Sequence, residues 1–491
     1  MFESAEIGHS MTKQALERQL PRLRKALLDA QFDLLQSAPA SIVVIVHGMD
    51  GAGKGETINS LNSWMDARHI HTLGIDEPTD EEQQHAYMWR FWRMLPPKGK
   101  MALLSGSWYS ELLTLEQQRK QGKARQELVL EHILRFERML AQEGVLVLKF
   151  WLHLSKDSQR ARFKALEKRK KTRWRVTKRD WKHHAHYDKI HRLAERVLHA
   201  TDEPHAPWIV VDGSDARYRN FSVAKTVLQA LTVRLKRKIV PVDPPSAMVA
   251  TARDTSLLTH LKLSQPMPRP TYDKELERYQ GKLNRLSREA AFRQHSVVAV
   301  MEGVDAAGKG GAIRRITSAL DARICRVVPT AAPTDEERAH PYLWRFWRHA
   351  PALGNVVIFD RSWYGRVLVE RVEHFASDAE WMRAYGEIND FEEALIEGGA
   401  IVAKYWLQIS HGEQLTRFSA RQKTGYKKYK ITPDDWRNRA KWDDYQGATC
   451  DMIDRTSTEI APWVLVEAEN KYYARIKILK DLCQRIEAKL G

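Results

Sequence analysis

An internal duplication limits most strongly what this chain can fold into. The segment HGMDGAGKG, which begins at His47, recurs as EGVDAAGKG from Glu302, so that its leading glycines lie 255 residues apart. The same offset relates PTDEE at 78–82 to PTDEE at 333–337, and WRFWR at 89–93 to WRFWR at 344–348. Constant spacing over this length predicts two tandem copies of one domain fold.

Prolines mark the predicted boundary between the copies. Pro241-Val-Asp-Pro-Pro245 is followed by Pro266, Pro268 and Pro270, a composition typical of a linker. The 491 residues also exceed what one hydrophobic core usually serves. We therefore predict a first domain at 1–240, a linker at 241–270 and a second domain at 271–491.

Short apolar runs alternate with helical stretches in each copy. In the second copy a helix is expected over Tyr272–Gln294, another from about Gly311, and a last one over Ala474–Leu490. The expected strands are Ser296–Met301, Ile324–Val328, Val356–Phe359, Ile401–Leu407 and Trp463–Glu467. This alternation predicts an α/β fold in which a parallel sheet is covered by helices on both faces.

A phosphate-binding loop is predicted where the first of these strands ends. Gly303-x-x-x-x-Gly308-Lys309 follows a strand and opens a helix, the context that a P-loop requires. Successive backbone amides and the helix N-terminus would face phosphate oxygens, and the lysine adds a full positive charge. The predicted phosphate-binding residues of this loop are Gly303, Ala306, Ala307, Gly308 and Gly310.

The loop lacks the hydroxyl that usually helps to hold Mg²⁺. Gly310 and Gly311 stand where Ser or Thr is usual, so a metal would need carboxylates, whose oxygens Mg²⁺ prefers. Asp305 lies within the loop, and Asp360 ends an apolar strand. We predict both as metal ligands, with Lys309 and the neighbouring Arg361 neutralising charge on a transferred phosphoryl group.

The two copies differ at these positions. Through the 255-residue offset, Asp360 corresponds to Ser105, Arg361 to Gly106, Arg366 to Glu111 and Arg314 to Asn59. The first copy keeps Asp50 and Lys54. We therefore expect that the first copy could still bind phosphate but would transfer it poorly or not at all.

The formal net charge of +17 indicates a polyanionic partner, such as nucleic acid, an anionic membrane or a phosphate polymer. Basic residues concentrate after the strand that ends near residue 407, where a P-loop kinase carries a mobile lid. A solvated helix face explains each of them equally well. The basic side chains predicted to bind phosphate are Arg314, Arg417, Arg421, Lys427 and Lys428.

Four residues are predicted nucleotide contacts, with competing structural explanations. Trp344 is a candidate for stacking on a base, although aromatic residues at this density more often pack in a core. Asp335 and Glu336 could contact a ribose or base, and helix capping explains them as well. Arg348 completes the set. The cluster His183-His-Ala-His186 does not predict zinc, because no cysteine or carboxylate set completes a site.

Five motifs in order resemble the polyphosphate kinase 2 family, and the resemblance covers both halves of the chain. They are EGVDAAGKGG at 302–311, PTDEE at 333–337, WRFWR at 344–348, FDRSWY at 359–364 and DRTST at 454–458. The fused layout is similar to a subgroup that makes ADP from AMP with inorganic polyphosphate. The resemblance implies thymidylate-kinase-like P-loop domains with a helical lid, Mg²⁺ dependence and activity in the second copy.

Several alternatives stay open from the residues alone. ADP could be the main acceptor, giving ATP; ATP could be the donor of a nucleotide kinase; or the protein could bind polyphosphate or nucleic acid without catalysis. We expect no nucleic-acid partner and leave the oligomeric state open, a homo-oligomer included.

The composition also indicates where the protein works. Apolar runs such as 41–46 are too short to span a bilayer, and residues 1–10 lack an apolar signal core. Three widely spaced cysteines do not form a disulfide framework. We expect a cytoplasmic protein.

Overall fold

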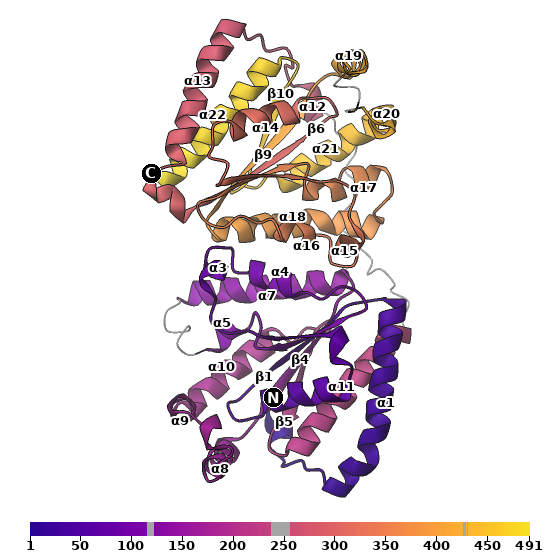
Figure 1. The fold of residues 1–491 in the computed structure, drawn as a ribbon, viewed down its shortest axis with the longest axis vertical. Coiled ribbons are helices and arrows are strands. Elements are labelled where there is room, and N and C mark those ends of the chain that lie inside the picture. The colour runs from indigo at the N-terminus through magenta and orange to yellow at the C-terminus, as the bar shows by residue number, and fades with distance from the viewer. Residues whose placement is uncertain (115–121, 237–255, 426–428, 430) are drawn as a thin grey trace. The chain divides into compact units, whose positions relative to one another are not determined.

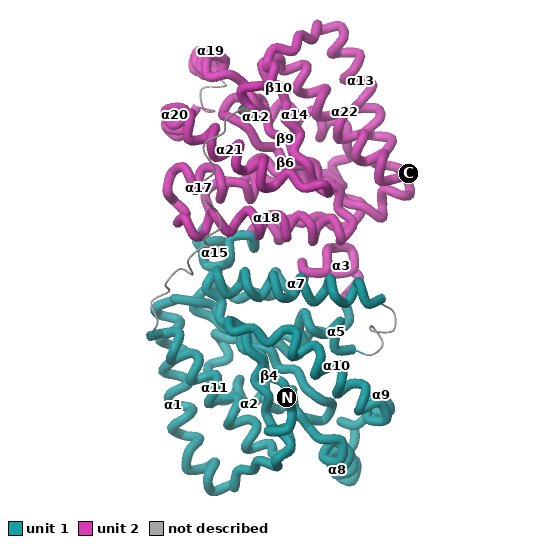
Figure 2. The backbone as a smooth tube through the Cα atoms, turned by 180° about the vertical axis from the view of Figure 1, so that it is seen from behind, with its two compact units in different colours: residues 1–77, 90–241, 334–344 teal, residues 78–89, 242–333, 345–491 magenta. Residues whose placement is uncertain are grey.

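The computed structural model describes residues 1–114, 122–236, 256–425, 429 and 431–491. They form two compact units, each built on its own sheet (Figure 2). The first unit comprises residues 1–77, 90–241 and 334–344, and the second comprises residues 78–89, 242–333 and 345–491.

Each unit contains a five-stranded sheet whose strand pairs are all parallel (Figure 1). The first sheet has the order β2-β3-β1-β4-β5 and the second β7-β8-β6-β9-β10. The strands are β1 (Ile42–Gly48), β2 (Ile70–Gly74), β3 (Met101–Ser105), β4 (Leu146–His153), β5 (Trp208–Asp212), β6 (Ser296–Gly303), β7 (Cys325–Pro329), β8 (Val356–Asp360), β9 (Ala400–Gln408) and β10 (Trp463–Glu467). The identical order confirms a duplicated α/β domain.

Helices cover both sheets. Those of the first copy are α1 (Lys13–Ser37), α2 (Lys54–Trp64), α3 (Asp80–Gln83), α4 (Trp89–Met94), α5 (Ser110–Leu113), α7 (Lys123–Gln142), α8 (Lys156–Glu167), α9 (Lys178–Ala185), α10 (Tyr187–Ala200) and α11 (Ala216–Lys236). Those that follow are α12 (Ser256–Thr259), α13 (Arg269–Leu286), α14 (Lys309–Thr317), α15 (Asp335–Arg338), α16 (Trp344–Trp347), α17 (Val369–Val372), α18 (Asp378–Glu397), α19 (His411–Gln422), α20 (Pro433–Ala440), α21 (Trp442–Thr456) and α22 (Lys471–Leu490).

The central strand of the second sheet explains why the strands are parallel and buried. β6 pairs with β8 on one side and β9 on the other, and residues 297–301 have no exposed surface. A strand covered on both faces requires a continuous apolar run, and its crossover connections place helices over the sheet. The carboxyl edge of β6, where the glycine loop begins, therefore lies in the middle of the sheet.

The predicted elements agree with the observed ones except at some ends. The expected helix Tyr272–Gln294 is wrong at its end, because α13 stops at Leu286 and Glu289 adopts an extended conformation before a 3₁₀ turn at Ala290–Gln294. The helix after the loop begins at Lys309, two residues earlier than expected. The last helix begins at Lys471, because the Asn470 side chain caps it.

The predicted linker is only partly described. Residues 241–255 lie outside the described residues, while α12 and the first residues of α13 lie within the predicted range 241–270. The three-part division of the chain stays a prediction.

Candidate active site

The glycine loop of the second copy joins β6 to α14 as a compact turn. Gly303 has φ 144°, and a Cβ there would lie 2.4 Å from the Leu407 carbonyl oxygen on β9, so only glycine fits. Gly308 has φ 119° and immediately precedes α14. Ala306, at φ 65°, is also left-handed. The structure thus places Ala306, Ala307, Gly308 and Gly310 at the N-terminus of α14, where amides and the helix dipole favour an anion, and Gly303 at the end of β6.

Lys309 folds back over this loop. Its Nζ donates to the Gly303 carbonyl oxygen at 2.6 Å and lies 3.4 Å from that of Val304. Burial, and secondarily the neighbouring charge of Arg361, lower the pKa of Lys309. The ammonium group is therefore held at the loop by weak neutral acceptors, which an incoming phosphate oxygen can replace.

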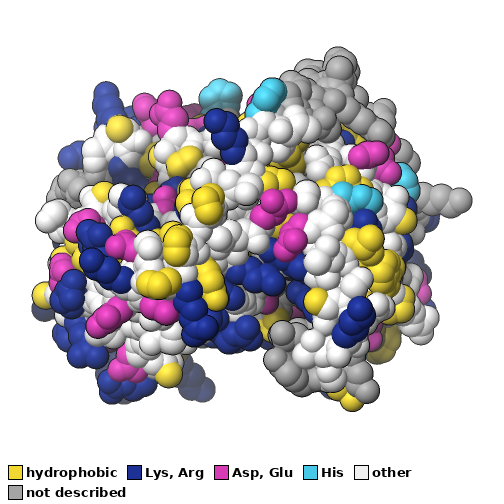
Figure 3. All heavy atoms as spheres, turned by 90° about the horizontal axis from the view of Figure 1, so that it is seen from above, with side chains coloured by type: hydrophobic (Ala, Val, Ile, Leu, Met, Phe, Trp, Pro, Cys, Tyr) yellow, Lys and Arg dark blue, Asp and Glu magenta, His cyan; other side chains and the backbone are white. Residues whose placement is uncertain are grey.

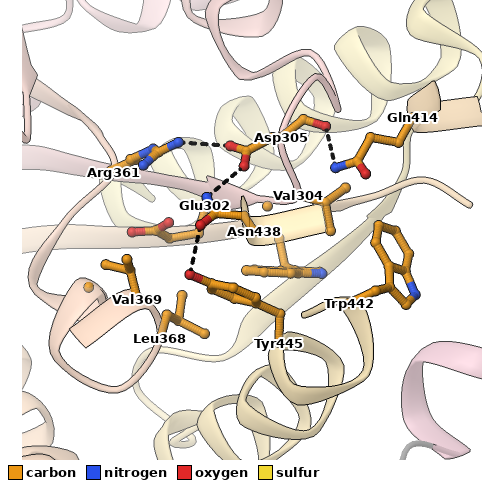
Figure 4. Close-up of a pocket in the computed structure, with 13 residues that line it drawn as sticks. Glu302, Val304, Asp305, Arg361, Leu368, Val369, Gln414, Asn438, Trp442 and Tyr445 are labelled. Atoms are coloured by element: carbon orange, nitrogen blue, oxygen red, sulfur yellow. Dashed lines mark hydrogen bonds and ion pairs between the residues drawn. The ribbon is translucent and has the colours of Figure 1, made fainter. Parts of the chain in front are cut away.

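Asp305 is the centre of the polar contacts at the loop (Figure 4). Its Oδ1 accepts from Arg361 Nη2 at 2.8 Å and its Oδ2 from Asn438 Nδ2 at 2.9 Å. The backbone oxygen of Asp305 accepts from Gln414 Nε2 at 3.2 Å. Arg361, which follows β8, and Asn438 on α20 therefore converge on the Asp305 carboxylate, while Gln414 on α19 holds the backbone of the same residue.

Arg361 adopts a strained backbone conformation. Its φ is 63°, a left-handed value that costs an L-residue about 1–3 kcal/mol and is often found at functional sites. Its counterpart Gly106 has φ 86° without that cost. The geometry of the turn is thus common to both copies, and only the second places a guanidinium there.

Asp360 is the last residue of β8 and pairs in register with Met301 on β6. Its charge acts on both Lys309 and Arg361. Each oxygen of Asp305 accepts one hydrogen bond and retains a further lone pair. The two carboxylates thus offer hard oxygen donors at adjacent points of the sheet edge, which is a donor set that fits Mg²⁺.

The structure adds residues that the sequence did not single out. Glu302 is 5% exposed and accepts from Ser362 Oγ at 2.8 Å, and burial raises the pKa of Glu302. In the first copy His47 replaces it and lies 2.8 Å from Ser107 Oγ. The sequence signal for Glu302 was a polar residue at the end of an otherwise apolar strand, which occurs in both copies. Asn438 and Gln414 carried no such signal.

An apolar pocket adjoins the Asp305–Arg361 pair (Figure 4). Tyr445 lies at its wall and donates to Asn438 Oδ1 at 3.0 Å. The aliphatic and aromatic lining lowers the local dielectric, which strengthens charge interactions at the loop. Its apolar residues include Val304, Leu368, Val369, Trp406 and Trp442.

Arg417 was predicted to bind phosphate, and the structure shows where its donors go. Its side chain is 5% exposed; Nη1 donates to the carbonyl oxygens of Ala306 and Ala307, and Nη2 to those of Ala468 and Glu469. Nε donates to Glu413 Oε1 at 2.6 Å. In this arrangement Arg417 braces the back of the loop, and direct contact with phosphate stays a prediction.

Two of the other basic candidates lie on different helices of the second copy, and two are not described. Arg314 is exposed on α14, and Arg421 is partly buried on α19. Lys427 and Lys428 lie outside the described residues. Figure 3 shows Lys and Arg side chains over much of the face in view, with acidic side chains among them.

The predicted nucleotide residues mostly have structural roles in the described contacts. Thr334 and Glu337 form a capping box for α15, and the exposed Asp335 pairs with Arg338. Trp344 is 7% exposed and stacks on His340 at 3.7 Å between ring centroids. Asp335, Glu336 and Trp344 belong to residues 334–344 of the first unit, and Arg348 is exposed in the second. Contact with a nucleotide stays a prediction for all four.

The loop of the first copy is arranged differently. Asp50 Oδ2 lies 2.7 Å from His183 Nδ1, which explains one histidine of the cluster at 183–186 without a metal. Glu56, the counterpart of Gly311, enters the first turn of α2. Its carboxylate oxygens lie 3.1 Å from Arg162 Nη2, 2.9 Å from Arg175 Nη1 and 3.0 Å from Arg219 Nη2. Three guanidinium groups thus surround an internal anion.

A strand–loop–helix turn with a loop lysine, followed by Asp360 and Arg361 at the end of the neighbouring strand, is the arrangement expected of a P-loop kinase. The family model for polyphosphate kinase 2 (PPK2) matches residues 10–239 and again 267–490. The chain belongs to the polyphosphate kinase 2 family.

Similar proteins cover the whole chain. It is 51% identical over 490 residues to the polyphosphate:AMP phosphotransferase of Pseudomonas aeruginosa, covering 99% of each sequence. It is 35% identical over 474 residues to the protein of that name from Acinetobacter johnsonii, covering 94% of this chain and 95% of the relative. The crystal structure of a putative polyphosphate kinase 2 from P. aeruginosa PA01 superposes with a TM-score of 0.91 at 49% identity, covering 100% of this chain and 99% of the other.

Among the helices in the described part of the chain, none combines the length and apolarity needed to cross a membrane.

Proposed function

We propose that this protein transfers a phosphoryl group from inorganic polyphosphate to AMP and so forms ADP. The observation that carries the proposal is the likeness along nearly the whole length, at 51% identity, to a protein named for that reaction. The loop and the Asp305–Arg361 pair supply the geometry for phosphoryl transfer. Free thiols at Cys325 and Cys483 fit the reducing cytoplasm as its location.

The chemistry assigns a task to each group at the loop. An oxygen of the AMP phosphate attacks the terminal phosphorus of polyphosphate; the new P–O bond makes ADP, and the bond to the shortened polyphosphate breaks. Loop amides and Lys309 hold the donor phosphates, and Arg361 neutralises charge on the transferred group. Asp305 and Asp360 would hold Mg²⁺, which when bound withdraws charge from phosphate oxygens.

One assay separates this reaction from its alternatives. Purified protein is incubated with Mg²⁺, long-chain polyphosphate and AMP, without ATP, and ADP is followed by chromatography. We expect ADP to form and to increase with polyphosphate. ADP formed only from ATP and AMP would indicate a nucleotide kinase, and rapid ATP formation from ADP would make ADP the preferred acceptor. If none of these combinations of donor and acceptor yields a nucleotide product, the protein binds polyphosphate or nucleic acid without catalysis.

We further propose that the second copy alone performs the transfer. The first copy has Ser105 and Gly106 in place of Asp360 and Arg361. Three arginines near its loop already form ion pairs with the Glu56 carboxylate. Arg219 is fully buried, and its Nη1 donates to the Ala52 carbonyl oxygen of the loop at 2.9 Å. A phosphate would have to displace a carboxylate bound by charge-assisted hydrogen bonds.

Substituting Glu56→Gly, the residue of the second copy, is expected to open a second polyanion site. The variant removes the internal anion and with it the contacts that Arg162, Arg175 and Arg219 make to it. Isothermal titration with tripolyphosphate should give one site for the natural protein and two for the variant. Glu17→Ala, which removes an exposed carboxylate on α1, is the control and should keep one site. If Glu56→Gly still binds tripolyphosphate at one site only, the Glu56 carboxylate is not what keeps phosphate from the loop of the first copy.

A further inference from the structure

Three side chains of the metal-ligating type meet in the first copy at the carboxyl end of β4. His153 is the last residue of β4, His191 lies on α10, and Glu6 follows the 3₁₀ turn Glu3–Ala5. One ligand atom from each lies within 4.8 Å of the other two. Segments 147 and 38 residues apart from His153 therefore bring imidazole and carboxylate donors to one point.

The three donors lie close enough together for small side-chain movements to bring them around one ion. His153 Nε2 lies 2.8 Å from Glu6 Oε1, and the His153 and His191 rings are 5.6 Å apart between centroids and inclined by 73°. Ligand atoms about 2.0–2.1 Å from a tetrahedral Zn²⁺ lie roughly 3.4 Å from one another. Inclined imidazoles at this separation can point one nitrogen each at a common centre.

The His153 ring is buried and packed against another aromatic ring. The side chain is fully buried, and the Phe2 ring stacks on it at 4.5 Å with an interplanar angle of 6°. Burial lowers the pKa of His153. Its Nδ1 is buried and has no hydrogen-bond partner among the described residues. A fully buried ring with a rigid orientation loses little entropy when it binds a metal.

The second copy does not share these donors. The counterparts of His153 and His191 are Gln408 and Gln446. Gln408 uses its side chain within the protein: its Oε1 accepts from Trp406 Nε1 at 2.8 Å and its Nε2 donates to the Ile409 carbonyl oxygen. The histidine pair is therefore required neither by the fold nor by phosphoryl transfer. A cavity of about 400 Å³ lined by Glu6, Asp188 and His191 leaves room for water as a further ligand.

We propose that Glu6, His153 and His191 bind one transition-metal ion, Zn²⁺ by preference, which fastens the segment around Glu6 to β4 and α10. Imidazole nitrogens favour zinc over magnesium, so this ion is distinct from the Mg²⁺ of phosphoryl transfer. Each copy would then depend on a different metal: the second for chemistry and the first for the stability of its sheet edge.

The test uses tag-free full-length protein dialysed against EDTA. Titration with ZnCl₂ should show one tight site, and Co²⁺ in its place should give the visible absorption of a tetrahedral centre. Glu6→Gln, His153→Gln and His191→Gln should each weaken Zn²⁺ binding at least 10-fold and remove the Co²⁺ bands. His71→Gln, at an exposed histidine, should leave both unchanged.

Stability supplies an independent readout. Zn²⁺ should raise the Tm of the natural protein and of His71→Gln, and should not raise that of Glu6→Gln, whose exposed position keeps the variant folded. ADP formation at saturating Mg²⁺ should be the same in Glu6→Gln and the natural protein, which separates this site from the proposed reaction. Absence of a tight Zn²⁺ site, or Zn²⁺ binding that survives all three substitutions, would overturn the proposal.

Discussion

Asp360→Asn should lower the rate of ADP formation from polyphosphate and AMP by roughly 10²–10³-fold, the loss typical when an electrostatic contact to the transition state is removed. The amide keeps the size of the side chain at the end of β8 but carries no charge, so a Mg²⁺ ligand is lost. Lys309 and Arg361 would also lose the carboxylate whose charge acts on them. The measurement is kcat at saturating polyphosphate, AMP and Mg²⁺.

Ser105→Ala is the matched control, since Ser105 ends β3 at the position that Asp360 occupies on β8. It should retain nearly full activity. Circular dichroism should show both variants folded. An Asp360→Asn variant that keeps more than about a tenth of the natural rate, against the loss expected at such a contact, would remove Asp360 from the proposed chemistry.

The second large effect is on stability and concerns Lys404→Ala. Lys404 on β9 is fully buried, and its Nζ donates to Glu392 Oε2 at 2.7 Å, to Tyr364 Oη at 3.0 Å and to the Thr456 carbonyl oxygen at 2.6 Å. Without the lysine, Glu392 remains as a buried, uncompensated charge. We expect the free energy of unfolding of the second copy to fall by about 3–5 kcal/mol, measured by urea denaturation.

Two further variants separate the cause from general damage. Lys404→Ala combined with Glu392→Gln removes both charges and should recover much of the loss. Lys274→Ala, at an exposed site, should change stability by less than about 0.5 kcal/mol. If Lys404→Ala lowers the free energy of unfolding by no more than Lys274→Ala does, the buried Lys404–Glu392 pair does not stabilise the fold.

The buried pair shows how the duplication separates fold from function. In the first copy Lys149 Nζ lies 2.7 Å from Glu137 Oε2 and 3.0 Å from Tyr109 Oη. The first copy has Ser105 and Gly106 in place of Asp360 and Arg361, yet it keeps the same buried contacts. The network is therefore common to both copies, whereas the Asp305–Arg361 contact belongs to the second copy.

Much of the fold could be predicted because its signals are local. Apolar runs fixed the strands, and Trp463–Glu467 was predicted with the bounds of β10. The loop could also be located, since its glycines and lysine are contiguous in sequence. The helix ends were harder to predict, because each depends on a single residue. Asn470 caps the start of α22, and the extended Glu289 separates α13 from the 3₁₀ turn that follows it.

The partners of the loop could not be predicted in this way. Asn438 binds a carboxylate 133 residues away, and Arg417 reaches loop carbonyls about 110 residues away. Such pairs depend on how α19 and α20 pack, not on any local pattern. A basic side chain near a lid is predicted from sequence to bind phosphate, whereas the burial of Arg417 and its five hydrogen bonds within the protein are visible only in the structure.

The most direct test compares the two loop lysines. Lys309 and Lys54 occupy equivalent positions, and each donates to the carbonyl oxygen of the first loop glycine, Gly303 or Gly48. In the polyphosphate and AMP assay, Lys309→Ala should lower kcat/KM by roughly 10²–10³-fold, while Lys54→Ala should keep most of the natural value. Equal losses in the two variants would contradict transfer by the second copy alone.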